Sequence, residues 1–218
     1  KESGVQHRQK VRVRGYNEQS LDTRVFLEIK RKDNMAIAKV RASVRFKDLR
    51  SLLESGDVER YVPRPEAREE ARRFLFHIYR HSRKPMVLIQ YEREAYFYRF
   101  DSSVRLTLDK NLRSLAFPEL EDVYEETRTR LSFPGHFLLE VKFSKGVPSW
   151  FKGILHSFGL ERTSFSKYCE SLDFHGIPES CSRARLFSNA DPIGSAASLG
   201  SGLPDTTSAP TFTGTFGR

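Results

Sequence analysis

Apolar and basic residues alternate along three short segments near the start of the chain. Residues 10–14 read Lys-Val-Arg-Val-Arg, and a similar alternation recurs in residues 26–32 and 37–41. Because successive side chains of a β-strand point to opposite faces, each segment predicts a strand with one apolar and one cationic face. If the strands are neighbours, like charges lie opposite one another, which destabilises a sheet. The pattern therefore predicts that the charged face binds something strongly anionic.

Hydrophobic spacing predicts both strands and helices in the rest of the chain. Strands are expected at 10–16, 24–32, 36–45, 86–92, 95–100, 103–109 and 136–144. Helices are expected at 46–53, 65–82 and 150–158, with a last helical turn at 164–168. His77 and His81 lie one helical turn apart, a spacing that permits a metal site. No acidic ligand is obvious beside them, so a structural role is favoured.

The composition is typical of a globular domain with an anionic partner. Hydrophobic residues make up 38% and charged residues 30% of the 218 residues, and the net charge is +9. This excess of bases favours nucleic acid, phosphate compounds or an acidic surface as the partner. No apolar run approaches the roughly 20 residues that span a bilayer. Cys169 and Cys181 lack metal-ligand spacing and suggest no disulfide framework, so a reducing, cytoplasmic location is expected.

The sequence divides into one domain and a tail. Residues 1–190 are expected to form the domain, whereas residues 191–218 are rich in Ser, Gly, Thr and Pro. Such a composition cannot bury enough apolar area to order itself, so we expect the tail to be disordered and dispensable.

Later segments repeat the alternation of the first three. Arg105, Thr107 and Asp109 alternate with apolar residues, as do Glu140 and Lys142. One interpretation is an antiparallel sheet with a solvated face. The other is a sheet that curls into a tunnel, whose charged interior requires anions and metal ions to neutralise it. The pattern favours the tunnel, because the early strands are so consistently basic.

Taken in order, these segments resemble the vacuolar transporter chaperone (VTC) domain over about residues 10–170. That domain is the polyphosphate polymerase branch of the triphosphate tunnel metalloenzymes, in the CYTH-like superfamily. The segments that carry the resemblance are Lys10-Val-Arg12-Val-Arg14-Gly-Tyr16, Phe26-Leu-Glu28-Ile-Lys30-Arg-Lys32, Lys39-Val-Arg41, Tyr91-Glu-Arg93-Glu-Ala-Tyr96, Val104-Arg105-Leu-Thr-Leu-Asp109, Leu139-Glu140-Val-Lys142-Phe143, Pro148-Ser-Trp150 and Ser164-Phe-Ser166-Lys167-Tyr168.

The resemblance implies an α+β fold, an antiparallel β-barrel or triphosphate tunnel with flanking helices, in which the family's N-terminal strands are expected to be missing. It implies a catalytic role for Lys167, Arg12 and Arg14, and a divalent metal, Mn²⁺ or Mg²⁺, on Glu140. Arg41 and Lys32 are further phosphate-binding candidates. The positions that match the family's phosphate-binding residues are Arg12, Arg14, Lys30, Lys39, Arg93, Arg105, Ser166 and Lys167.

The implied activity is ATP-dependent polyphosphate polymerisation, in which the γ-phosphate of ATP moves onto a growing polyphosphate chain. A triphosphatase of the same fold and a non-catalytic polyphosphate- or polyanion-binding module are the alternatives. The expected partners are ATP and inorganic polyphosphate. Nucleic acid is not expected, because the charged faces are basic rather than aromatic and so offer little stacking for bases.

Overall fold

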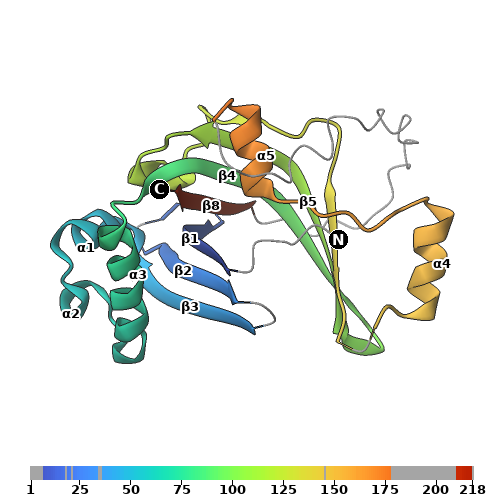
Figure 1. Ribbon diagram of the computed structural model, residues 1–218, viewed down its shortest axis with the longest axis horizontal. Helices are drawn as coiled ribbons and strands as arrows, with labels where there is room; N and C mark the ends of the chain where they lie inside the picture. The colour runs from blue at the N-terminus through green and yellow to red at the C-terminus, as the bar shows by residue number, and fades with distance from the viewer. Residues whose placement is uncertain are drawn as a thin grey trace.

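A single antiparallel sheet of eight strands organises the chain (Figure 1). The computed structural model describes residues 7–17, 19–20, 22–33, 36–144, 146–177 and 210–217. The strand order is β3-β2-β1-β8-β4-β5-β6, and β7 pairs with β5. The strands are β1 (His7–Tyr16), β2 (Arg24–Asp33), β3 (Ala36–Arg45), β4 (Lys84–Tyr98), β5 (Asp101–Ala116), β6 (Arg130–Leu131), β7 (Leu138–Lys142) and β8 (Pro210–Gly217).

This architecture confirms the predicted α+β class with antiparallel pairing. The strand path ends at β3 on one side and at β6 on the other, so the pairings among the described residues form an open sheet and not a closed barrel. The helices are α1 (Leu49–Ser55), α2 (Val58–Tyr61), α3 (Arg68–Arg80), α4 (Ser149–Ser157) and α5 (Lys167–Phe174), with short 3₁₀ turns η1 (Phe46–Asp48), η2 (Pro65–Ala67) and η3 (Leu120–Tyr124).

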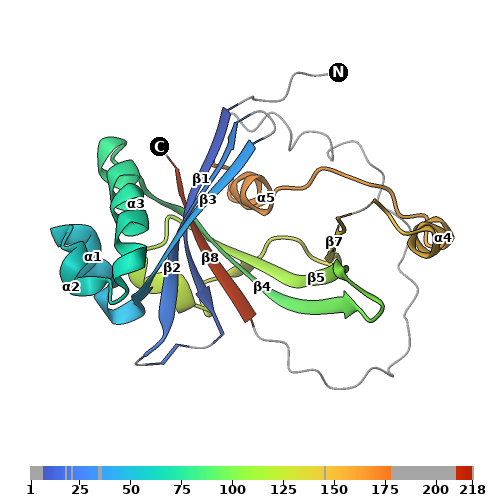
Figure 2. The same ribbon diagram turned by 90° about the horizontal axis from the view of Figure 1, so that it is seen from below.

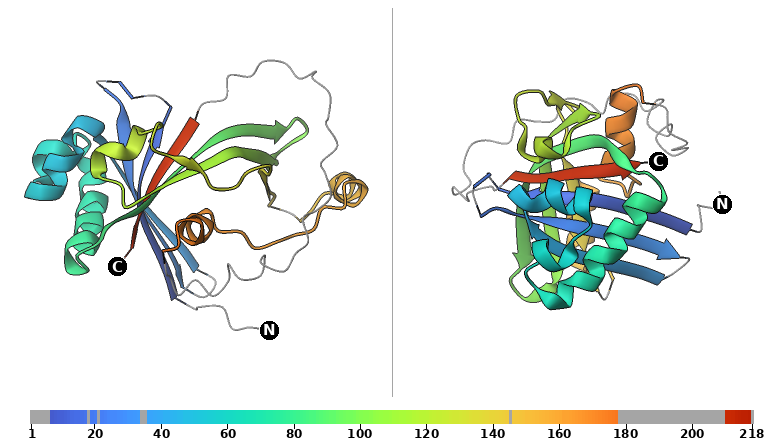
Figure 3. Two further views of the ribbon diagram at one scale, coloured as in Figure 1. Left: turned by 90° about the horizontal axis from the view of Figure 1, so that it is seen from above. Right: turned by 90° about the vertical axis from the view of Figure 1, so that its left-hand side faces the viewer.

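The helices lie on different sides of the sheet. Helices α1–α3 lie across one side of β1–β3 (Figure 3). Helix α5 lies on the other side, in the angle between β1–β3 and β4–β5 (Figure 2). The apolar positions of the alternating segments, such as Val11, Leu27 and Val44, are fully buried under α1–α3 in one core with Phe74. Since side chains alternate along a strand, the cationic positions face the side on which α5 lies.

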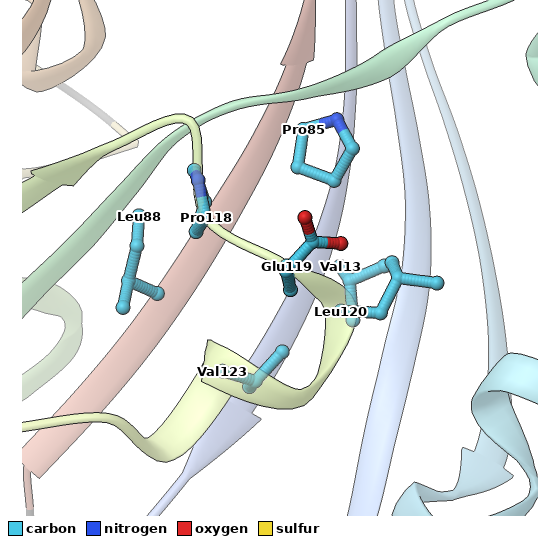
Figure 4. A pocket seen from close by; sticks show the side chains of 7 residues that line it. All are labelled: Val13, Pro85, Leu88, Pro118, Glu119, Leu120 and Val123. Atoms are coloured by element: carbon cyan, nitrogen blue, oxygen red, sulfur yellow. The ribbon is translucent and has the colours of Figure 1, made fainter.

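The outer side of the β1–β8–β4 junction is closed by η3. Figure 4 shows Val13, Leu88, Leu120 and Val123, which come from β1, β4 and η3, around a small apolar cavity. A second core, built from Val87, Ile89 and Tyr91 on β4 and Leu112 on β5, packs against Leu172 of α5 on the opposite side. The outer side of β1–β3 and of the β1–β8–β4 junction is therefore largely apolar and covered, whereas the cationic positions of β1–β3 face the α5 side.

Strand β8 corrects the expectation that residues 191–218 are disordered. It pairs with β1, from Val11 opposite Phe216 to Tyr16 opposite Thr211, and with β4 along its other edge. The composition of the whole tail hides this strand, because residues that favour strands are confined to the short Thr-Phe-Thr-Gly-Thr-Phe run. The rest of the expected tail, residues 191–209 and 218, lies outside the described residues.

Other differences from the predicted elements are smaller. The strands expected at 86–92 and 95–100 form one continuous strand, β4, and the short elements α2, η3 and β6 carried no clear periodic signal. Cys169 is disulfide-bonded, contrary to the expectation for the cysteines, and Cys181 lies outside the described residues. No helix in the described part of the chain is long and apolar enough to cross a membrane.

Candidate phosphate-binding face

A row of lysines crosses the three N-terminal strands. Lys10 on β1 lies opposite Lys30 on β2, which in turn lies opposite Lys39 on β3. Burial lowers the pKa of Lys30, and the neighbouring charges of Lys39 and Arg12 lower it further. The charge of Glu140 on β7 acts in the opposite direction. Lys30 and Lys39 therefore place two positive charges opposite each other, as the alternating pattern predicted, and an anion placed there would relieve their repulsion.

The next row holds arginines around one carboxylate. Arg12 lies opposite Glu28, and Glu28 lies opposite Arg41. The Glu28 Oε2 atom is 2.7 Å from Arg12 Nε and 3.7 Å from Arg14 Nε, and Oε1 is 3.4 Å from Arg41 Nε. Burial lowers the pKa of Arg14, but the charge of Glu28 and a hydrogen bond to the Tyr16 hydroxyl outweigh it and raise the pKa. Glu28 thus anchors three predicted phosphate-binding residues.

A second group of charges lies on β4, β5 and α5. Arg93 donates to both oxygens of Asp109, at 2.6 Å and 2.7 Å, and Lys167 Nζ is 2.6 Å from Asp109 Oδ2. Burial raises the pKa of Asp109, but the hydrogen bond from Arg93 and the charge of Lys167 outweigh it, so the pKa is lowered. The Tyr91 ring lies beneath both cations, 5.2 Å from Arg93 Cζ and 4.7 Å from Lys167 Nζ.

The two groups act on each other across the angle of the sheet (Figure 2). The charges of Lys142 and Glu140, both on β7, lie near enough to influence the pKa of Lys30 on β2. Tyr91 on β4 acts in the same way on Arg14 of β1. The structure therefore brings predicted residues from both ends of the domain to one concave side, which we call the cationic face. Its predicted members are Arg12, Arg14, Lys30, Lys39, Arg41, Arg93, Arg105, Glu140 and Lys167.

Arg105 belongs to this face, and Ser166 immediately precedes Lys167 at the start of α5. Arg105 lies opposite Lys142 on β7, and its guanidinium carbon is 5.2 Å from the centre of the Phe97 ring. Ser166 is the N-cap of α5, where its hydroxyl accepts the backbone N–H of Cys169 at 3.4 Å. Its position beside Lys167 is thus explained first by helix capping. The Lys32 side chain lies outside the described residues.

The metal prediction has one carboxylate to support it. Glu140 is 48% exposed, and its Oε1 is 3.2 Å from Lys142 Nζ. In the described residues, no group of three or more His, Cys, Asp and Glu side chains gathers around one point. Magnesium sites in phosphate-binding proteins often use one or two carboxylates and complete their shell with phosphate oxygens and water. Glu140 fits a cation of that kind and not one that is held by protein ligands alone.

His77 of α3 and His81, the C-cap that follows it, lie away from this face. His77 Nε2 is 2.8 Å from a guanidinium nitrogen of Arg31 and 3.1 Å from Gln9 Nε2. Burial lowers the pKa of His77, and the charge of Arg31 lowers it further, so the neutral ring accepts a hydrogen bond from Arg31. The structural role that the sequence favoured is the one seen.

Sequence reasoning missed the carboxylates that hold the cations. Glu28 and Asp109 both lie within the segments that carry the family resemblance, but the sequence analysis assigns a role to neither of them. The available signal was their position, because each is an acid on the same strand face as the predicted phosphate-binding bases. An acid in such a place is suited to orient its neighbours rather than to bind phosphate.

A concave, cationic side on an antiparallel α+β sheet is a surface suited to a compact polyanion. A profile of the VTC domain matches residues 1–175, and the chain belongs to this family. This confirms the resemblance found over about residues 10–170, and it supports a polyphosphate-related function in general terms. A comparison with curated proteins gave no match.

Proposed function

We propose that the chain is a polyphosphate polymerase that moves the γ-phosphoryl group of ATP onto the end of a polyphosphate chain. The position of Lys30 on β2 opposite Lys39 on β3 is the observation that carries this proposal, because like charges that face each other favour a bound anion. Family membership supports the same substrate class. ATP and polyphosphate are the proposed partners, and the cytoplasm is the proposed location, although the disulfide of Cys169 removes the cysteine argument for it.

Phosphoryl transfer requires mainly that the protein position the reactants and neutralise their charge. Arg12 and Arg14 would hold phosphate oxygens in the forked geometry of guanidinium groups, and Lys30 and Lys39 would add point charges. Lys167 would neutralise charge that develops as the phosphoryl group transfers. The attacking atom is an oxygen of the polyphosphate end and the leaving group is ADP, so no side-chain nucleophile is needed. A Mn²⁺ or Mg²⁺ ion at Glu140 would supply Lewis-acid stabilisation of the phosphate oxygens.

Two alternatives share this face. If water attacks in place of a phosphate end, the same arrangement hydrolyses triphosphate. If no reaction follows binding, the chain is a polyphosphate-binding module. The pairing of Glu140 with Lys142 favours this last alternative, because an occupied carboxylate is less available to a metal ion.

Product analysis separates the three functions. The full chain is incubated with γ-labelled ATP, a short polyphosphate primer and Mn²⁺ or Mg²⁺, and the labelled products are resolved by size. Label in a lengthening polymer is the expected result. Label in free phosphate indicates a triphosphatase. Unreacted ATP, together with polyphosphate binding measured by calorimetry, would contradict catalysis and leave the binding module.

A further inference from the structure

Asp109 is the most enclosed charged group on the cationic face. Its side chain is 1% exposed, and its two oxygens receive Arg93 in a two-pronged contact and Lys167 in a single one. The cations come from elements far apart in the sequence, β4 and α5, and one carboxylate holds both. Such a buried charge is tolerated only when it is paired and hydrogen-bonded.

The contact does more than dock α5. Leu172, in the middle of α5, is fully buried against Val87, Ile89 and Leu112. This apolar contact fixes the helix on the sheet independently of Lys167, which is the first residue of α5. The ion pair therefore acts mainly on the direction of the two cationic side chains.

We infer that Asp109 is a positioning residue, which holds Arg93 and Lys167 side by side so that both meet one transferring phosphoryl group. This inference rests on the proposed function. Without the carboxylate, the two cations would repel each other and sample several rotamers, which costs the alignment that phosphoryl transfer needs. Asp109 also removes one positive charge from the face, so its loss should not weaken the attraction for phosphate.

The first test is independent of activity. Asp109→Asn keeps the shape but places an amide among three donor groups, and the rate at which Lys167 reacts with an amine-acylating reagent is followed by mass spectrometry. We expect Lys167 to react several-fold faster in this variant, whereas Lys142, which is 65% exposed, keeps its rate. An unchanged rate at Lys167 would overturn the inference.

The second test separates positioning from binding. In D109N we expect kcat to fall about tenfold or more, a barrier increase of about 1.4 kcal/mol, while the affinity for inorganic triphosphate stays equal or increases. The double variant D109N/K167Q should lose less activity than the product of the two single losses, because Asp109 acts in part through Lys167. A positioning role would be contradicted if the loss of kcat in the double variant equalled the product of the two single losses. A parallel loss of affinity and kcat in D109N would also contradict it.

Glu94→Gln is the matched control. Glu94 pairs with Lys110 across the same two strands, β4 and β5, but its strand position points to the opposite face. It should leave kcat and the labelling of Lys167 unchanged. If the wild-type chain has no turnover, the proposed function fails, and the labelling rates still decide whether Asp109 holds Lys167.

Discussion

The two halves of the cationic face balance their charges differently. In β1–β3, Glu28 pairs with three arginines, and Lys30 and Lys39 lie opposite each other. In β4, β5, β7 and α5, Asp109 engages two cations and Glu140 engages one. An added anion therefore gains most at the β1–β3 half, where like charges crowd together. In the half formed by β4, β5, β7 and α5, the carboxylates instead fix the positions of the cationic side chains.

This contrast predicts that the number of bases on a face is a poor measure of its attraction for anions. What matters is the charge that remains after the protein's own carboxylates are counted. We expect the β1–β3 half to supply affinity and the β4–β5 half, with its buried Asp109, to supply alignment. The predictions below test this division of labour.

The largest effect should follow from separating the halves. A chain that ends at residue 209 lacks β8, which pairs with both β1 and β4. We expect the free energy of unfolding to fall by about 2 kcal/mol or more, because backbone hydrogen bonds are lost along both edges. Thr213→Pro, which removes one backbone donor in the middle of β8, should cause part of this loss. Chemical unfolding measures the stability of both variants, and calorimetry measures their binding of triphosphate. If the truncated chain matches the full chain in stability and binding, the two halves hold together without β8.

Glu140→Gln should act on turnover. The change keeps the side-chain shape and removes the charge that would hold a divalent cation, so we expect metal-dependent turnover to fall about tenfold or more, or about 1.4 kcal/mol in barrier. Circular dichroism should show an unchanged fold. Metal titrations of the rate provide the measurement, and the same metal dependence in both proteins would leave Glu140 as a simple partner of Lys142.

Lys30→Gln should act on affinity. Removing one charge from the lysine row should weaken triphosphate binding about tenfold, which corresponds to about 1.4 kcal/mol. Arg31→Gln is its matched control, because Arg31 is the next residue on β2 and contacts His77 on the outer side. It should change the affinity by less than about twofold. Equal losses in the two variants would mean that overall charge, and not the face, determines binding.

The smallest effect is a pH dependence. The folded-state pKa of Lys30 lies below the ordinary 10.5, chiefly because of burial and then because of Lys39 and Arg12. The unfolded chain therefore binds this proton more tightly, and stability should rise with pH between the lowered pKa and 10.5. Bound triphosphate favours the ammonium, so binding should take up protons in that window. Calorimetry in two buffers with different ionisation heats detects the uptake, and Lys30→Gln should abolish it.

The sequence predicted the β1–β3 half well, because its alternation is long and regular. Lys30 and Lys39 came out opposite each other, and the apolar positions came out buried under α1–α3. The alternating bases favoured a sheet that curls, but no local pattern indicated that β7 would lie near Lys30, because that depends on tertiary packing. Strand β8 was missed because its short Thr-rich run lies in a segment whose composition is typical of disorder.

Site residues divide in the same way. Bases on alternating positions could be chosen from spacing, but the partners of those bases could not. That Arg93 and Lys167 share Asp109 depends on how α5 docks, which no local pattern records. For Ser166 the residue was chosen, but its structural role was missed. The resemblance assigned it to phosphate, whereas its side chain caps α5.

Competition for one site tests the central claim most directly, namely that the cationic face binds contiguous phosphates. Labelled ATP bound to the full chain is challenged with inorganic triphosphate, short polyphosphate, AMP and single-stranded RNA, at low and at raised salt. We expect triphosphate and polyphosphate to displace ATP at similar concentrations, AMP to require roughly a hundredfold more, and salt to weaken every competitor that binds. If AMP or RNA displaces ATP as well as triphosphate does, the face reads nucleotides or nucleic acid, and the polyphosphate account is wrong.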